Sequence, residues 1–229
     1  PALGTPLSPD EWMKRLGELP LSYQPGERFH YSHATDVLGF IVGRIEGKPL
    51  AEVLERRIFG PLGMKDTAFH VPRDKQERAA KLYRIGPETD ALEEVPFPFY
   101  PEPPAFAAGG GGLVSTADDY LTFARLMLGG GEVDGVRLVK PETLALMTTD
   151  RLTSAQREIP FMGIPFWLGQ GFGLGVSMIT DPVKQAWMGA GNAGAFGWPG
   201  AFGTWWQADP AADMVLIYLI QNSMPLGPE

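Results

Sequence analysis

The last third of the sequence, from about residue 165, sets the strongest limit on the fold. The stretches GFGLGVSMI (171–179), GWPGAFGTWWQAD (197–209) and MVLIYLIQN (214–222) are rich in aromatic and β-branched residues, as β-strands are. Between the last two, DPAAD combines residues that favour a tight turn. We therefore expect strands of an antiparallel sheet over residues 165–222.

The first 160 residues carry helical patterns instead. Gly47 ends a first predicted helix, and Pro49 stands at the start of a second, where the first turn tolerates proline. Apolar residues with helical spacing predict the buried stripe of the first helix, namely Ala34, Val37, Leu38, Ile41, Val42 and Ile45. The second helix would bury Leu50, Val53, Leu54 and Ile58.

A further helix follows a run of four glycines, 109–112, which we interpret as a flexible turn. Thr116 and Asp119 resemble a capping box at its start. Its buried face would consist of Tyr120, Phe123, Ala124, Met127 and Leu128. KPETLALMTT (140–149) predicts another short helix. The proline-rich residues 71–107 predict a long connection that runs over the surface in extended stretches.

The predicted class is therefore α+β, as one domain over residues 1–229: 1–160 mostly helical, with the connection at 71–107, and 165–222 in the sheet. Hydrophobic residues make up 44% of the chain and charged residues 20%, which is an ordinary globular composition. A net charge of −8 without long basic runs argues against nucleic-acid binding. The absence of cysteine excludes disulfides and thiolate metal sites. No apolar run has the length of a membrane span.

Several familiar motifs do not explain the chain. GAGNAG (189–194) matches G-x-G-x-x-G, but no strand is predicted before it and no helix after it, so it does not predict a dinucleotide site. There is no G-x-S-x-G, P-loop or H-E-x-x-H motif. Three histidines, His30, His33 and His70, are too few and too poorly spaced for a zinc site. Tyr31, taken alone, is more often a packing residue at a helix start than a base.

Four stretches in order resemble the serine hydrolases of the β-lactamase and penicillin-binding-protein superfamily. They are QPGERFHYSHATDVLGFIVGRIEGKPLAEVLERRIFGPLGM, GGGGLVSTADDYLTFARLMLGGGEVDGVRLVKPETLALM, FGLGVSMI and FGWPGAFGTWWQADPAADMVLIYLIQ. The likeness is greatest to carboxylesterases built on the class C β-lactamase fold, called family VIII esterases. The resemblance implies a β-lactamase/transpeptidase-like fold and serine chemistry that needs no metal or organic cofactor.

In such enzymes the serine of S-x-x-K attacks an acyl carbon, and a tyrosine takes and returns the proton. The resemblance gives Tyr31 this role. It aligns Trp198-Pro199-Gly200 with the Lys-Thr-Gly motif of β-lactamases, so that Gly200 lets the strand approach the substrate. The backbone N–H of Ala201 would be one donor of the oxyanion hole.

Two departures from the family pattern bear on the substrate. Trp198 replaces the lysine that attracts a substrate carboxylate, and offers an apolar wall instead. His33 replaces the asparagine of Tyr-x-Asn, and either points a polar edge into the cleft or has a structural role. Both departures favour small, uncharged esters as substrates over β-lactams.

A third departure is the nucleophile. None of the seven serines is followed by lysine three residues later, so the chain contains no S-x-x-K. We expect that motif upstream of Pro1, and a closing helix downstream, in which case the missing N-terminal portion would be a partner of this chain. Ser32 has no lysine partner and is not expected to replace the nucleophile. The isolated chain is therefore predicted to be inactive, and its compartment is not predicted.

Two alternatives stay open at this stage. The first is an amide hydrolase, either a β-lactamase or a D-amino-acid peptidase. The second is a non-catalytic binding protein on the same fold. Tyr31 together with the Trp198-Pro199-Gly200 strand favours the esterase, since a binding module does not need a general base.

Overall fold

A computed structural model describes residues 5–31, 33–95, 102–161, 163–189 and 191–223. The chain forms two compact units. The first unit comprises Pro1–Glu77 and Phe99–Asp119, and the second comprises Arg78–Pro98 and Tyr120–Glu229. Helix α5 (Ala117–Leu128) runs from the first into the second.

Helices make up the first unit. They are α1 (Pro9–Gly17), α2 (Ala34–Glu46), α3 (Leu50–Leu54), a π-helical stretch (Glu55–Phe59), α4 (Gly60–Leu62) and most of a 3₁₀ helix (Arg73–Arg78). The Ser8 side chain caps α1 by accepting a hydrogen bond from the Glu11 N–H. Gly47 ends α2 as predicted, in the left-handed conformation that favours glycine (φ 63°).

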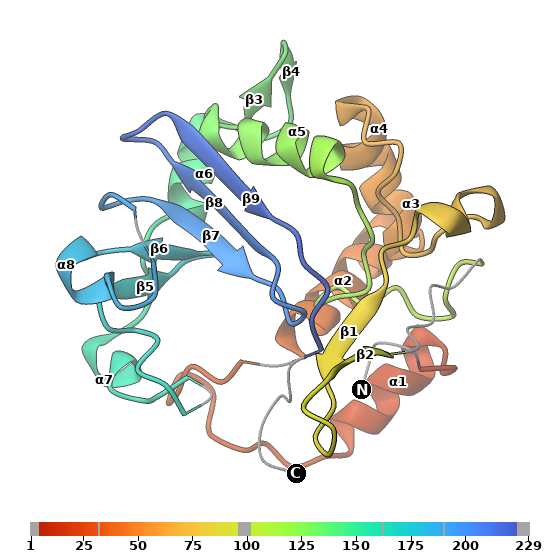
Figure 1. Cartoon of the computed structure of the whole chain (residues 1–229), viewed down its shortest axis with the longest axis horizontal. Helices are drawn as coiled ribbons and strands as arrows, with labels where there is room; N and C mark the ends of the chain where they lie inside the picture. Colours follow the sequence, from red (N-terminus) through yellow and green to blue (C-terminus); the bar gives the residue numbers. More distant parts are fainter. Residues whose placement is uncertain (1–4, 32, 96–101, 162, 190, 224–229) are drawn as a thin grey trace. The chain divides into compact units, whose positions relative to one another are not determined.

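The second unit contains a five-stranded antiparallel sheet in the order β5-β6-β7-β8-β9 (Figure 1). Its strands are β5 (Gln170–Phe172), β6 (Ser177–Ile179), β7 (Phe196–Pro199), β8 (Trp205–Asp209) and β9 (Met214–Tyr218). The runs 171–179 and 197–209 each fold into a hairpin, and the predicted turn DPAAD joins β8 to β9. The unit also holds the short helices α6 (Pro141–Met147), α7 (Ser154–Arg157) and α8 (Pro182–Gln185). The predicted class, helices with an antiparallel sheet, is confirmed.

The core of the second unit forms where α5 and α6 pack on the sheet. Ala124 and Met127 from α5 contact Phe196 and Trp206 from the sheet and Leu144 from α6. The other residues of the predicted α5 face pack against this cluster partly buried, namely Tyr120, Phe123 and Leu128. The predicted buried face of α5 is therefore confirmed.

The predicted buried stripe of α2 is wrong for most of its residues. Leu38, Ile41, Val42 and Ile45 are 58%, 43%, 37% and 78% exposed. The buried residues of α2 are instead Asp36 and Gly39. A Cβ on Gly39 would lie 3.3 Å from the Cα of Gly109 and 2.7 Å from a methyl carbon of Leu50, so this side of the helix makes the close contacts.

The predicted connection 71–107 is wrong for residues 73–95. These residues form the 3₁₀ helix and a hairpin of β1 (Leu82–Ile85) and β2 (Leu92–Val95). The Tyr83 N–H donates to the Gln221 carbonyl, which joins this hairpin to the segment after β9. Most of the proline-rich run, 96–101, lies outside the described residues.

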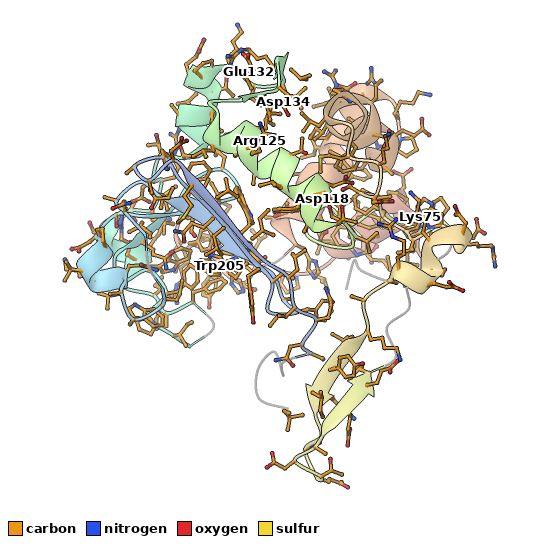
Figure 2. The ribbon with its side chains drawn as sticks, turned by 45° about the horizontal axis from the view of Figure 1, so that its top comes forward. Lys75, Asp118, Arg125, Glu132, Asp134 and Trp205 are labelled. Atoms are coloured by element: carbon orange, nitrogen blue, oxygen red, sulfur yellow. The ribbon has the colours of Figure 1, made fainter. Side chains whose placement is uncertain are left out.

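A second unpredicted hairpin joins β3 (Glu132–Val133) to β4 (Val136–Arg137). The Arg125 guanidinium on α5 binds both carboxylate oxygens of Asp134 in its turn, at 3.0 and 2.8 Å (Figure 2). Within the residues that the structure describes, no helix is both long enough and apolar enough to cross a bilayer.

Candidate active site

Tyr31 lies directly before α2 and is 43% exposed. His33 occupies the N-cap position of the helix, and its Nδ1 lies 2.9 Å from Oδ2 of Asp36. The Trp12 ring from α1 meets the His33 ring edge to face, at a centroid distance of 5.6 Å. His33 is therefore oriented by contacts within the first unit.

Asp36 is the residue that sequence reasoning missed here. Its side chain is almost fully buried, and its Oδ1 accepts a hydrogen bond of 2.8 Å from the Gly110 N–H. Asp36 thus connects the segment that carries Tyr31 to the glycine run. An acidic residue three positions after His33, inside an apolar helix, was the available signal.

The glycine run is packed at its start, which corrects its interpretation as a flexible turn. A Cβ on Gly109 would lie 2.4 Å from the Thr35 carbonyl oxygen, closer than any side chain tolerates. Glycine at 109 therefore permits the close approach to α2 that brings the Gly110 N–H to Asp36.

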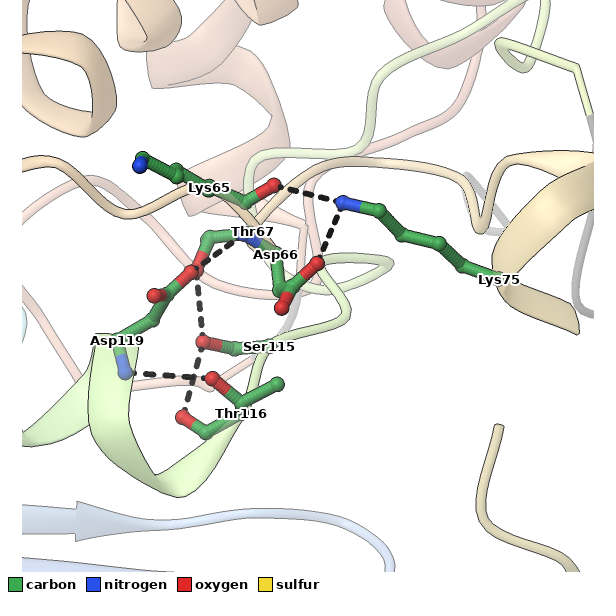
Figure 3. A network of polar contacts seen from close by, with 7 residues as sticks. All are labelled: Lys65, Asp66, Thr67, Lys75, Ser115, Thr116 and Asp119. Atoms are coloured by element: carbon green, nitrogen blue, oxygen red, sulfur yellow. Dashed lines mark hydrogen bonds and ion pairs between the residues drawn. The ribbon is translucent and has the colours of Figure 1, made fainter. Parts of the chain in front are cut away.

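A polar network holds the start of α5 (Figure 3). The Asp119 N–H donates to Thr116 Oγ1 at 3.3 Å, which is half of the expected capping box. The Asp119 carboxylate accepts from the Asp66 N–H and the Thr67 hydroxyl, at 2.7 and 2.9 Å. Ser115 shares a hydrogen bond of 2.8 Å with Thr67, so its hydroxyl has a structural partner in this network.

The second group of predicted residues lies on the hairpin of β7 and β8. Trp198 is half-buried on β7, and rings of Phe161, Phe166 and Phe172 contact its indole at centroid distances of 5.9, 5.6 and 5.0 Å. All three rings meet the indole at steep angles, between 60° and 75°. These three phenylalanines were not singled out from the sequence, because apolar residues near strands are read as core.

Gly200 and Ala201 form the turn after β7. The Gly200 N–H donates to the Thr204 carbonyl at 2.8 Å, and the Gly203 N–H donates to the Gly200 carbonyl at 3.0 Å. A Cβ on Gly200 would lie 1.9 Å from Thr204 Oγ1, so any larger residue there requires the Thr204 side chain to rotate. Ala201 is exposed, and within the described part of the chain its N–H has no protein acceptor.

Asn192, in the segment GAGNAG, is hydrogen-bonded to the last residue of β8. The Asn192 backbone N–H and side-chain amide both donate to Oδ2 of Asp209, at 3.0 and 2.9 Å. Burial alone would raise the pKa of Asp209, but hydrogen bonds from Asn192, Ala211 and Ala212 outweigh it and hold that pKa below its ordinary value.

Of the predicted site residues, Tyr31 and His33 belong to the first unit, whereas Trp198, Gly200 and Ala201 belong to the second. Within each group the residues lie close along the chain. Ser32 falls outside the described residues.

Comparisons with known proteins match this chain over nearly its whole length. The family model described as Beta-lactamase matches residues 1–228. Protein Rv1367c of Mycobacterium tuberculosis is 54% identical over 96% of this chain and 55% of its own length. Esterase EstB of Burkholderia gladioli is 33% identical over 93% of this chain and 55% of its own length.

Among solved structures, EstCE1, a hydrolase with promiscuous acyltransferase activity, superposes with a TM-score of 0.77 at 26% identity. The match covers 95% of this chain and 57% of EstCE1. The chain thus spans somewhat more than half the length of the relatives it matches.

Proposed function

Because this chain belongs to the β-lactamase family, we propose that it contributes the general base and the substrate-binding strand of a serine hydrolase of small, uncharged carboxylic esters. The observation that carries this proposal is Trp198. It stands where the resemblance places a cationic lysine, and three phenylalanine rings surround its indole. An aromatic wall favours an apolar ester group and gives no ion pair to a substrate carboxylate.

In the proposed reaction, a serine Oγ attacks the ester carbonyl carbon while the Tyr31 side-chain oxygen, as the general base, takes the hydroxyl proton. The carbonyl oxygen becomes an oxyanion and accepts a hydrogen bond from the Ala201 N–H. Ala201 is exposed and its N–H has no acceptor in the described residues, which supports this assignment. Collapse of the intermediate breaks the ester C–O bond, and Tyr31 returns the proton to the departing alcohol oxygen.

Deacylation repeats these steps with water. The water oxygen attacks the acyl carbon while Tyr31 takes a proton from that water. The bond from the acyl carbon to the serine oxygen then breaks, and Tyr31 gives the proton to the serine oxygen, which regenerates the free hydroxyl. His33, held by Asp36, is proposed to line the substrate side of Tyr31, and Gly200 to keep the strand close to the substrate.

The nucleophile of this scheme is not among the 229 residues, since they contain no S-x-x-K. Ser115 has no lysine partner at that spacing, and its hydroxyl is hydrogen-bonded to Thr67. We therefore propose that the 229-residue polypeptide alone does not turn over esters and that an S-x-x-K segment outside this sequence completes the site.

The experiment compares two substrates on two forms of the protein. p-Nitrophenyl butyrate and nitrocefin are given to the 229-residue polypeptide and to the gene product purified from its native source. The proposal predicts butyrate hydrolysis by the native product, little nitrocefin cleavage, and no turnover by the polypeptide. Preferential nitrocefin cleavage would indicate the amide hydrolase instead, and a native product inactive on both would indicate the binding protein.

A further inference from the structure

Trp198 stands in a cluster of aromatic rings that the proposed chemistry does not itself require. Phe172 belongs to β5, whereas Phe161 and Phe166 lie in the segment before it. Trp167 contacts all three phenylalanines, at centroid distances of 5.6, 4.9 and 6.0 Å. Trp167 is buried behind the three rings, which lie between it and Trp198 as ring contacts on both sides show.

Contacts hold the described residues around these rings in place. Phe166 and Trp167 are only 3% and 4% exposed. Phe161 and Ile164 exchange two backbone hydrogen bonds, at 3.0 and 3.1 Å. Near the other end of the segment, Oδ1 of Asp150 accepts from the Phe172 N–H at 3.2 Å, and Arg157 forms an ion pair with the same carboxylate.

A tryptophan side chain has several rotamers, and a strand backbone alone does not select one. Edge-to-face ring pairs at 5–6 Å stabilise one arrangement by roughly 0.5–1.5 kcal/mol each. Two such contacts, from Phe161 and Phe172, and a tilted contact from Phe166 hold the Trp198 indole in one orientation. A wall held in this way keeps one position for any group placed against it.

We propose that Phe161, Phe166 and Phe172 determine specificity by positioning Trp198, so that the site takes esters with a short apolar acyl group and excludes long ones. This inference rests on the proposed function. The three rings act through Trp198 and are positioning residues. Loosening them lets the indole move aside, which deepens the space available to the acyl chain.

The first test measures chain-length selectivity in the native gene product. We expect Phe166→Leu to change the ratio of kcat/KM for p-nitrophenyl acetate and octanoate by about fivefold or more in favour of octanoate. The change should arise mainly from a lower KM for octanoate. Phe59→Leu is the matched control, because Phe59 is 6% exposed, against 3% for Phe166, and lies in the first unit. Equal ratios in wild type and Phe166→Leu would overturn the inference.

The second test needs no turnover and uses the 229-residue polypeptide. Its six tryptophans are labelled with 5-fluorotryptophan, and the ¹⁹F resonance of Trp198 is assigned with Trp198→Phe. Methyl hexanoate should shift this resonance in wild type and in Phe59→Leu, whereas sodium hexanoate should not. In Phe172→Leu the resonance should broaden or split, and its shift with the ester should fall at least about twofold.

The two tests separate the possible failures. A Trp198 resonance that responds to methyl hexanoate, in a native product that hydrolyses no ester, would refute the proposed function while leaving Trp198 as an ester-binding wall. A resonance unaffected by the ester, or equally sharp and responsive in Phe172→Leu, would overturn the positioning role even in an active esterase. If these leucine variants do not fold, Phe161→Leu removes a partly buried ring of the same cluster, and unchanged selectivity in that variant would overturn the inference.

Discussion

Asp36 offers the most direct test of how the Tyr31 segment is held. Replacing it by alanine removes the acceptor of the Gly110 N–H, at 2.8 Å, and the partner of His33 Nδ1, at 2.9 Å. A hydrogen bond to a charged group contributes about 1.5–3 kcal/mol. The His33 contact is worth less, about 0.5–1 kcal/mol, because the His33 side chain is 41% exposed.

Removing the carboxylate also removes the cost of burying it, which offsets part of this loss. We therefore expect Asp36→Ala to lower the free energy of unfolding by about 2–3 kcal/mol. For a chain of this size that corresponds to a fall in Tm of about 4–12 °C. Asp36→Asn retains an acceptor for Gly110 and should lose about 1 kcal/mol.

The assay is urea unfolding at pH 7, followed by tryptophan fluorescence. Asp74→Ala is the control, because Asp74 is exposed in the same unit, and its change should stay within about 0.5 kcal/mol. If Asp36→Ala is as stable as Asp74→Ala, the carboxylate does not hold the two segments together and the reasoning is refuted.

Two further predictions concern stability. Gly109→Ala places a Cβ 2.4 Å from the Thr35 carbonyl oxygen and should lower the free energy of unfolding by about 1–3 kcal/mol. Gly111→Ala is the control, because a Cβ there meets nothing within 4 Å. Equal unfolding midpoints for the two variants would contradict the close approach. The lowered pKa of Asp209 contributes stability that is present above the unfolded value of about 3.9 and is lost as pH falls through the folded value. Asp209→Asn should therefore differ most from wild type above about pH 5 and least in acid, and a difference independent of pH would show that ionised Asp209 is not responsible.

The sequence predicted those elements whose pattern is local. The α5 face follows from helical spacing, and the β8–β9 hairpin follows from the turn DPAAD. The β3–β4 hairpin has a local signal too, because Asp134 and Gly135 both adopt positive φ, as an Asp-Gly turn favours. That signal was available in the sequence but not used.

The stripe on α2 shows the limit of such reasoning. Helical spacing correctly places Leu38, Ile41 and Ile45 within one helix, but periodicity does not say which side has a packing partner. The contact that decides it, Asp36 with Gly110, joins residues 74 positions apart. Local pattern contains no information about a pair at that separation.

The candidate site also contains residues that the sequence identified and residues that only the structure identified. Tyr31 and Trp198 were found through the resemblance to a family, which supplies the chemistry that residue types alone do not. Asp36 and the rings of Phe161, Phe166 and Phe172 act by position, and only the structure shows what they contact. Gly200 was interpreted as a substrate-facing residue, and in the structure its N–H and carbonyl form the turn after β7 with Thr204 and Gly203.

The central claim, that Tyr31 is the base of a serine esterase, is tested most directly by covalent labelling of the native gene product. A p-nitrophenyl phosphonate ester is added to the wild type, to Tyr31→Phe and to Tyr218→Phe, in which an exposed tyrosine on β9 is changed. The account predicts one phosphonylated serine, within S-x-x-K, and labelling slowed about 100-fold or more in Tyr31→Phe but not in Tyr218→Phe. Labelling at the same rate in Tyr31→Phe, or of no serine at all, would contradict it.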